Sequence, residues 1–172
     1  MSGNNQGKLT TLSDLLRERQ RWRLKGLRVV WTNGCFELLH VGHVLYLECA
    51  KSLGDILVVG VNSDESFRRI KRREGPVVPQ DHRARVLASL SCVDRVLIFD
   101  APSPVEILRA LQPDIFVKGE DYTPESIDPG EREAVLAYGG EIRICPGVPG
   151  FSTTELIHRI VQLYGHRLRG PD

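Results

Sequence analysis

Short apolar segments alternate with longer segments of helical periodicity along most of this sequence, and that alternation limits the folds it can adopt. Residues 56–62 (Ile-Leu-Val-Val-Gly-Val-Asn) are hydrophobic at almost every position, as expected of a parallel strand covered on both faces. Strands that alternate with helices of about 10–15 residues indicate βαβ units. The sequence therefore predicts a single α/β domain built on a Rossmann-like, doubly wound, parallel five-stranded sheet.

The alternation also locates the expected elements. The expected strands are residues 28–33, 56–62, 95–99, 115–118 and 141–145, and the expected helices are residues 41–53, 81–90, 104–111, 129–138 and 153–164. An accessory amphipathic helix is expected before the first strand, at residues 11–25, with Ser13 as its N-cap and Gly26 as its stop. We accordingly predict an N-terminal tail and helix at residues 1–26, the main domain at 27–165 and a C-terminal tail at 166–172.

Composition narrows the class of protein. Of 172 residues, 41% are hydrophobic and 26% charged, and the formal net charge of +1 gives no sign of a nucleic-acid partner. No apolar run approaches the roughly 20 residues that span a bilayer, and the polar start lacks a signal peptide, so we expect a cytoplasmic protein without a membrane partner. Cys35, Cys49, Cys92 and Cys145 form no Cys-x-x-Cys pair and are predicted to be reduced thiols.

The segment that indicates chemistry is Thr32-Asn-Gly-Cys-Phe-Glu-Leu-Leu-His-Val-Gly-His43, which runs from a strand end into a helix. His40 and His43 are three residues apart, so their imidazoles share one face of the first turn. Gly34 permits a tight turn, and Gly42 leaves room for a ligand. The free N–H groups and the dipole of a helix N-terminus favour a phosphate, to which imidazoles can donate hydrogen bonds. This turn is therefore predicted to bind phosphate.

The pattern Asn-Gly-Cys-Phe-Glu-x-x-His-x-Gly-His resembles the signature of the HxGH, cytidylyltransferase-like nucleotidyltransferase superfamily. Later segments extend the resemblance, most closely to the ADP-heptose synthase nucleotidyltransferase family, over roughly residues 9–160. These segments are Val61-Asn-Ser-Asp64, Lys71, Arg83, Val117-Lys-Gly-Glu-Asp-Tyr122 and Gly150-Phe-Ser-Thr-Thr154. The sequence departs from the family pattern at Glu37, Arg72 and Glu120, where the family usually has Asp, Gly and Gly, and residues 125–133 are longer and more charged than expected.

The resemblance implies roles for individual residues. His40, His43 and Lys71 would be catalytic. The residues implied in nucleotide binding are Asn33, Gly34, Cys35, Phe36, His40, Gly42, His43, Lys118, Gly119, Asp121, Ser152 and Thr153. Those implied in binding the acceptor are Glu37, Asn62, Asp64, Lys71 and Arg83. Mg²⁺ would accompany the nucleoside triphosphate, and no protein side chain is assigned to a metal.

Simpler interpretations compete with several of these roles. The two histidines could be surface residues of a capped helix, or could bind zinc together with Cys35. Lys71 lies in the run at residues 68–73 (Arg-Arg-Ile-Lys-Arg-Arg), most of which is interpreted as a solvated basic loop. Arg83 could pair with a carboxylate.

Residues at strand ends and helix starts also have simpler interpretations. Lys118 could simply extend its amine to solvent. Asp64 could position a metal or cap a helix. Ser152 is a good N-cap, with Glu155 completing a capping box. Trp31 and Tyr122 could stack on a base or pack in the core.

The activity implied by the resemblance is transfer of AMP from ATP to D-glycero-β-D-manno-heptose 1-phosphate. This gives pyrophosphate and ADP-heptose, a precursor for bacterial surface lipopolysaccharide. The resemblance further implies a homodimer in a stand-alone form, so that a separate kinase supplies the substrate. Two competing functions stay open: a cytidylyltransferase acting on glycerol 3-phosphate or another polyol phosphate, and a nucleotide-binding module without turnover.

Overall fold

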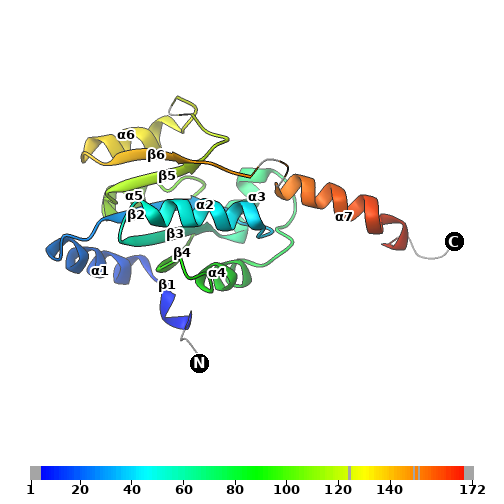
Figure 1. Ribbon diagram of the computed structural model, residues 1–172, viewed down its shortest axis with the longest axis horizontal. Coiled ribbons are helices and arrows are strands. Elements are labelled where there is room, and N and C mark those ends of the chain that lie inside the picture. The colour runs from blue at the N-terminus through cyan, green and yellow to red at the C-terminus, as the bar shows by residue number, and fades with distance from the viewer. Residues whose placement is uncertain (1–4, 124, 149, 151, 169–172) are drawn as a thin grey trace.

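The computed structural model describes residues 5–168 apart from residues 124, 149 and 151. They form a parallel six-stranded sheet with the spatial order β1-β4-β3-β2-β5-β6 (Figure 1). The strands are β1 (Leu9–Thr10), β2 (Val29–Gly34), β3 (Ile56–Asn62), β4 (Arg95–Phe99), β5 (Ile115–Gly119) and β6 (Glu141–Cys145). The α-helices are α1 (Leu12–Leu24), α2 (Val41–Ser52), α3 (Asp64–Lys71), α4 (Gln80–Ala88), α5 (Val105–Leu111), α6 (Pro129–Ala137) and α7 (Thr153–Leu168), and a short 3₁₀ helix η1 (Asn5–Lys8) comes first.

The sheet is doubly wound. From β2 the chain moves outward through β3 and β4, and then crosses back to β5 and β6 on the other side of β2. The winding direction therefore reverses between β2 and β5, and ligands of such sheets bind beyond the carboxyl ends of the strands at this point. The predicted Rossmann-like α/β fold is confirmed. The predicted number of strands is wrong, because β1 adds a sixth.

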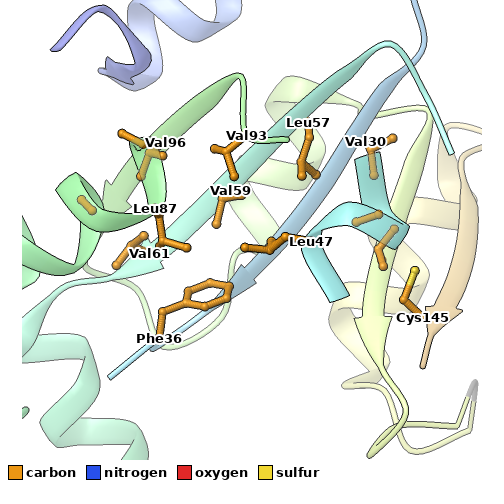
Figure 2. Close-up of a cluster of buried hydrophobic side chains, with 14 of the residues drawn as sticks. Val30, Phe36, Leu47, Leu57, Val59, Val61, Leu87, Val93, Val96 and Cys145 are labelled. Atoms are coloured by element: carbon orange, nitrogen blue, oxygen red, sulfur yellow. The ribbon is translucent and has the colours of Figure 1, made fainter. Parts of the chain in front are cut away.

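Two apolar layers cover the sheet. Leu47 of α2 and Leu87 of α4 pack with Val59 and Val61 of β3 on one face, in the cluster that Figure 2 shows. The opposite face packs against α1, α5 and α6, and its cluster includes Leu15, Trp31, Val58, Leu108, Phe116 and Val135. Trp31 is fully buried there, in agreement with the interpretation of that side chain as a core residue. Because both faces are covered, β3 needs apolar residues throughout.

Strand β1, helix α3 and the short helix η1 are absent from the prediction. Strand β1 pairs Leu9 and Thr10 with β4 and is too short to show a period of two residues. Helix α3 includes residues 68–71 of the predicted basic loop at 68–73, in which Ile70 is the only uncharged residue. Phe67 is nevertheless fully buried, and the Ser63 hydroxyl caps the helix by accepting from the Ser66 N–H at 3.0 Å.

Helix α1 is fastened to the sheet at the end opposite the strand carboxyl ends. Its N-cap is Thr11, whose Oγ1 accepts from the Asp14 N–H at 3.2 Å, so the prediction of Ser13 is wrong. The buried Arg19 donates to the carbonyl of Gln112 at 2.8 Å and pairs with Asp114 at 3.1 Å. The accessory helix is therefore part of the domain's second layer. Most other predicted bounds shift by one or two residues.

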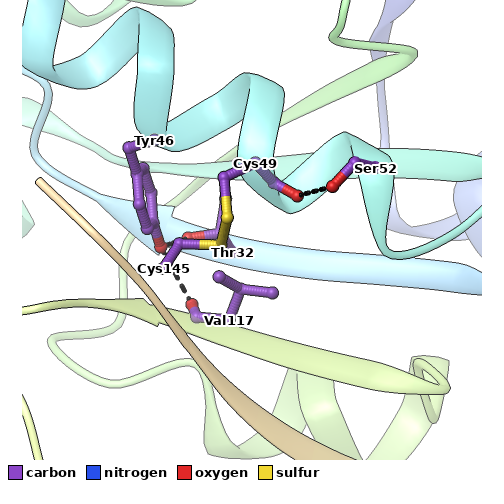
Figure 3. Close-up of a disulfide and its surroundings, with 6 residues drawn as sticks. All are labelled: Thr32, Tyr46, Cys49, Ser52, Val117 and Cys145. Atoms are coloured by element: carbon purple, nitrogen blue, oxygen red, sulfur yellow. Dashed lines mark hydrogen bonds between the residues drawn. A yellow bond between two sulfur atoms is a disulfide. The ribbon is translucent and has the colours of Figure 1, made fainter.

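A disulfide joins Cys49 of α2 to Cys145 at the end of β6, with Cα atoms 6.1 Å apart (Figure 3). The prediction of four reduced thiols is therefore wrong for this pair, whereas Cys35 and Cys92 are free. The two bonded cysteines are separated by 96 residues, and only the packing of α2 beside β6 brings them together. Tyr46 fastens the same helix, because its hydroxyl lies 2.5 Å from the Thr32 hydroxyl and donates to the Val117 carbonyl at 3.0 Å.

Helix α7 extends away from the sheet, as the orange and red segment of Figure 1 shows, and continues to Leu168 rather than ending at residue 164. From Thr153 to Gly165 its side chains are mostly exposed, including the apolar Ile160 and Val161. Only its first turn adjoins the end of the sheet that carries the predicted site. Within the described part of the chain, no helix has the length and apolar character needed to cross a membrane.

Candidate active site

A cavity of about 650 Å³ opens at the carboxyl ends of the central strands, where the winding direction of the sheet reverses. Every predicted site residue except Asp64 and Arg83 lines it. One side, which we call the β3 wall, consists of residues 62–83, from the end of β3 through α3 to the start of α4. The other, the β5–β6 wall, consists of residues 118–122 and the described residues of 147–155. The β2–α2 turn lies between them.

The β2–α2 turn brings the two histidines together. Phe36 adopts a left-handed backbone conformation (φ 48°), which is uncommon for a residue with a side chain and often marks a functional turn. His40 is the extended N-cap of α2, and the His43 N–H donates to the His40 carbonyl at 2.9 Å. The imidazole centroids lie 3.9 Å apart, and Phe36 lies against the His43 ring. The motif therefore forms the predicted pair of imidazoles on one face of a helix start.

Burial favours the neutral form of both histidines. Burial, and secondarily the neighbouring His40, lowers the pKa of His43 to about 4. Burial also lowers the pKa of His40. The Nδ1 atom of each ring is buried and has no hydrogen-bond partner among the described residues. Imidazoles with such free Nδ1 atoms can take up a proton when an anion binds beside them.

On the β3 wall, Arg83 joins three segments of the chain. Its buried guanidinium donates to the carbonyls of Cys35, Asn62 and Val78, and it pairs with Asp64 at 2.8 Å. The structure therefore agrees with the interpretation in which Arg83 pairs with a carboxylate. A direct role for Arg83 and Asp64 in binding the acceptor stays a prediction, and the structure places both beside the cavity rather than in its lining.

Lys71 lies on this wall, and Glu37 of the β2–α2 turn is joined to the same wall through Arg73. Lys71 is the exposed last residue of α3 and lines the cavity. The Glu37 side chain is only 4% exposed and pairs with Arg73 at 2.6 Å. Asn62 lines the cavity as well, but its amide already donates to the Ser66 hydroxyl at 2.9 Å.

On the β5–β6 wall, Lys118 is buried and forms an ion pair with Glu131 of α6 at 2.8 Å. Its ammonium also lies 5.2 Å from the Tyr122 ring centroid. The interpretation in which Lys118 extends its amine to solvent is therefore wrong. Tyr122 is 42% exposed at the cavity, and Glu120 lies against Gly147. This wall therefore presents an aromatic ring and carboxylates.

The start of α7 completes the β5–β6 wall. The Glu155 N–H donates to the Ser152 hydroxyl at 3.1 Å, so Ser152 caps the helix as expected. Thr153 and Thr154 line the cavity beside it. A helix start with free N–H groups and hydroxyls suits an anion, and it opens into the same cavity as the histidine pair.

Cys35 does not have the properties of a nucleophile or a ready metal ligand. Burial raises the pKa of its thiol. Among the residues that the structure describes, no three His, Cys, Asp or Glu side chains are arranged to hold a metal ion. The cavity instead offers imidazoles, the exposed Lys71, the Lys118–Glu131 pair and a helix start.

Several residues line the cavity in addition to the predicted ones: Tyr46, Ile70, Pro102, Glu131, Gly147, Val148, Gly150, Thr154 and Glu155. Glu131 matters most, because it neutralises Lys118. It comes from the following helix, 13 positions after the lysine, and no local pattern connects them.

The chain resembles known proteins in sequence over nearly its whole length. A family model described as cytidylyltransferase-like matches residues 31–159. "Bifunctional protein HldE" of Syntrophotalea carbinolica is 48% identical over 154 residues, which are 90% of this chain and 30% of that protein. The protein of the same name from Geobacter metallireducens is 43% identical over 162 residues, 94% of this chain and 33% of that protein. The chain thus spans about a third of the length of these curated relatives.

Two solved structures share the fold. A lipopolysaccharide core biosynthesis protein from Thermoplasma volcanium is 28% identical, with a TM-score of 0.58 over 72% of this chain and 98% of that one. A pantoate-beta-alanine ligase from Francisella tularensis has a TM-score of 0.59 over 95% of this chain and 80% of that one. At 14% identity, the second likeness concerns the fold alone.

Proposed function

This chain belongs to the cytidylyltransferase-like family, and from that membership we propose that it is a nucleotidyltransferase that transfers AMP from ATP to a sugar 1-phosphate. The observation that carries the proposal is the shared cavity of the histidine pair and the Ser152 helix start. Two helix N-termini with hydrogen-bond donors suit a polyphosphate between them. No nucleophilic side chain is needed for such a transfer.

The proposed reaction is a single in-line displacement. A phosphate oxygen of the acceptor forms a bond to the α-phosphorus of ATP, and the bond from that phosphorus to the β-bridging oxygen breaks. Pyrophosphate leaves with the electron pair. The acceptor phosphate is already ionised at neutral pH, so no general base is required. Catalysis then consists of holding two anions together and stabilising the charge on the leaving group.

The neutral histidines supply that stabilisation. Each imidazole presents one N–H donor at neutral pH, and the pair would take up a proton as negative charge gathers on the leaving pyrophosphate. Mg²⁺ would enter as part of the nucleotide substrate, bound by phosphate oxygens and water, and would neutralise part of the triphosphate charge.

The charges of the two walls suggest the orientation of the substrates. On the β5–β6 wall, the carboxylates of Glu120 and Asp121 repel phosphate, and together with the Tyr122 ring they suit the base and ribose. Lys71 on the β3 wall suits the phosphate of the acceptor. The nucleotide would therefore lie along the β5–β6 wall, with its α-phosphate directed toward Lys71.

For the acceptor we propose D-glycero-β-D-manno-heptose 1-phosphate, which gives ADP-heptose. The resemblance of the sequence motifs supports this choice, as does the 48% identity to a bifunctional protein HldE. The likeness to a lipopolysaccharide core biosynthesis protein agrees with it. The second candidate, transfer of CMP to a polyol phosphate, takes its support from the description of the family model.

Isotope tracing tests the reaction class. The purified protein would be incubated with ATP, Mg²⁺ and heptose 1-phosphate labelled with ¹⁸O in its phosphate. We expect ADP-heptose that retains every labelled oxygen and pyrophosphate that carries none, as measured by mass spectrometry. Label in pyrophosphate, or release of AMP without a nucleotide sugar, would contradict the displacement.

A further inference from the structure

Glu37 lies in the β2–α2 turn that carries the histidines, and its buried carboxylate is bonded to other residues of the protein. Its side chain is 4% exposed, and both oxygens have donors. Arg73 Nη2 donates to Oε2 at 2.6 Å, and the Val77 N–H donates to Oε1 at 3.2 Å. Both donors belong to the loop that connects α3 to α4, so one buried carboxylate joins the histidine turn to the β3 wall.

Arg73 is held from a second direction. Its guanidinium lies 5.0 Å from the ring centroid of Phe67, which is fully buried beneath α3. Arg72, between Arg73 and Lys71, ends α3 in a left-handed conformation (φ 51°). Arg73 thus lies two residues after Lys71, which lines the cavity together with Ile70 in the last turn of α3.

We propose that Glu37 and Arg73 are positioning residues, which set the distance between the histidine pair and Lys71 and thereby determine how tightly the acceptor phosphate is held. The inference rests on the proposed transfer reaction. In this proposal Glu37 acts through Arg73 and Lys71 and does not contact the acceptor directly. Removal of either partner leaves a buried carboxylate without its charge partner or frees the loop, and either change moves Lys71.

A double-mutant cycle tests the proposal, with Glu37→Gln, Arg73→Gln and the double variant. We expect each single variant to raise the KM of the acceptor about tenfold, with less than about a twofold change in the KM of ATP, because a small displacement of a binding group is costly. The double variant should be no worse than Glu37→Gln alone, because the two residues act as one unit. Arg73→Lys should restore part of the loss.

The matched control is the exposed pair formed by Glu65 and Arg69 on the same helix, 3.8 Å apart. Glu65→Gln and Arg69→Gln should leave both KM values within about twofold, because surface pairs contribute little. If Glu37 contacts the acceptor directly, Arg73→Gln would leave the acceptor KM unchanged while Glu37→Gln raises it. That result would overturn the proposal.

Amide exchange separates this proposal from the proposed function. By NMR, the Val77 N–H should exchange about tenfold faster in Arg73→Gln than in the wild type, because the loop loses its anchor. Unchanged exchange would contradict the positioning role even if transfer occurs. If the Val77 N–H exchanges faster in Arg73→Gln but the protein transfers AMP to no acceptor, the proposed function is refuted. The role of Arg73 in holding the loop would still be established.

Discussion

The two walls of the cavity are built differently. The β3 wall contains the buried polar residues Asn62, Ser63, Ser66 and Arg83, which hydrogen-bond to one another or to nearby backbone. On the β5–β6 wall, Glu120, Asp121 and Tyr122 are exposed, as is Ser152 at the start of α7. Buried, satisfied polar networks are rigid, whereas exposed loops adapt. We therefore expect the acceptor side to be preformed and the nucleotide side to close around its ligand.

The largest expected effect comes from the histidines between the walls. His40→Ala and His43→Ala should each lower turnover by about 10²-fold or more, the scale of one lost transition-state donor. Steady-state pyrophosphate release measures this, with His82→Ala, an exposed histidine of α4, as the control. Near wild-type turnover in both variants would refute the assigned mechanism.

A preformed β3 wall should be sensitive to loss of Arg83. Arg83→Met removes the donor to three carbonyls and the partner of Asp64, so we expect a loss of about 2–3 kcal/mol in the free energy of unfolding. Urea denaturation would measure it. The exposed Arg85 on the same helix provides the control, and Arg85→Met should cost less than about 0.5 kcal/mol. Equal costs would contradict the preformed wall.

Acid should destabilise the fold through His43. The pKa of His43 is lowered to about 4 in the folded state, below its unfolded value of about 6.5, so the unfolded state binds more protons between these pH values. The contribution of His43 to stability is therefore present above pH 6.5 and is lost as the pH falls toward 4. Relative to His43→Asn, the wild type should lose about 2 kcal/mol more over this range in urea denaturation at stepped pH. Parallel curves would show that His43 is not buried as described.

The smallest effect is expected on the β5–β6 wall. Ser152→Ala removes the N-cap of α7 and should cost about 1 kcal/mol of helix stability, with a several-fold rise in the KM of ATP. Thermal unfolding and initial rates measure the two changes. Ser13→Ala, in the first turn of α1 but not its cap, is the control. An unchanged KM for ATP would remove Ser152 from the nucleotide site.

The elements that could be predicted are those with local signals. Strand β3 is recognisable because a strand covered on both faces is apolar throughout, and the histidine pair is recognisable because its members are three residues apart on one helix turn. The two-residue strand β1 has no period to detect. Helix α3 has a single fully buried hydrophobic residue, Phe67, among charged neighbours, so its sequence resembles that of an exposed loop.

Contacts between distant segments could not be predicted. Cys49 and Cys145 meet only because α2 packs beside β6. The partners of Lys118 and Glu37 come from elements that follow in the chain, at Glu131 and Arg73. The resemblance identified many of the residues that line the cavity, but only the fold shows which of their charges are already paired.

The most direct test of the central claim is pyrophosphate release by the purified protein with Mg²⁺, crossing ATP and CTP with heptose 1-phosphate and glycerol 3-phosphate. Turnover with ATP and the heptose alone is the predicted result. Turnover with CTP and glycerol 3-phosphate would assign the second function instead. If no combination releases pyrophosphate and calorimetry still detects nucleotide binding, the proposed transfer is contradicted and the chain is a nucleotide-binding module.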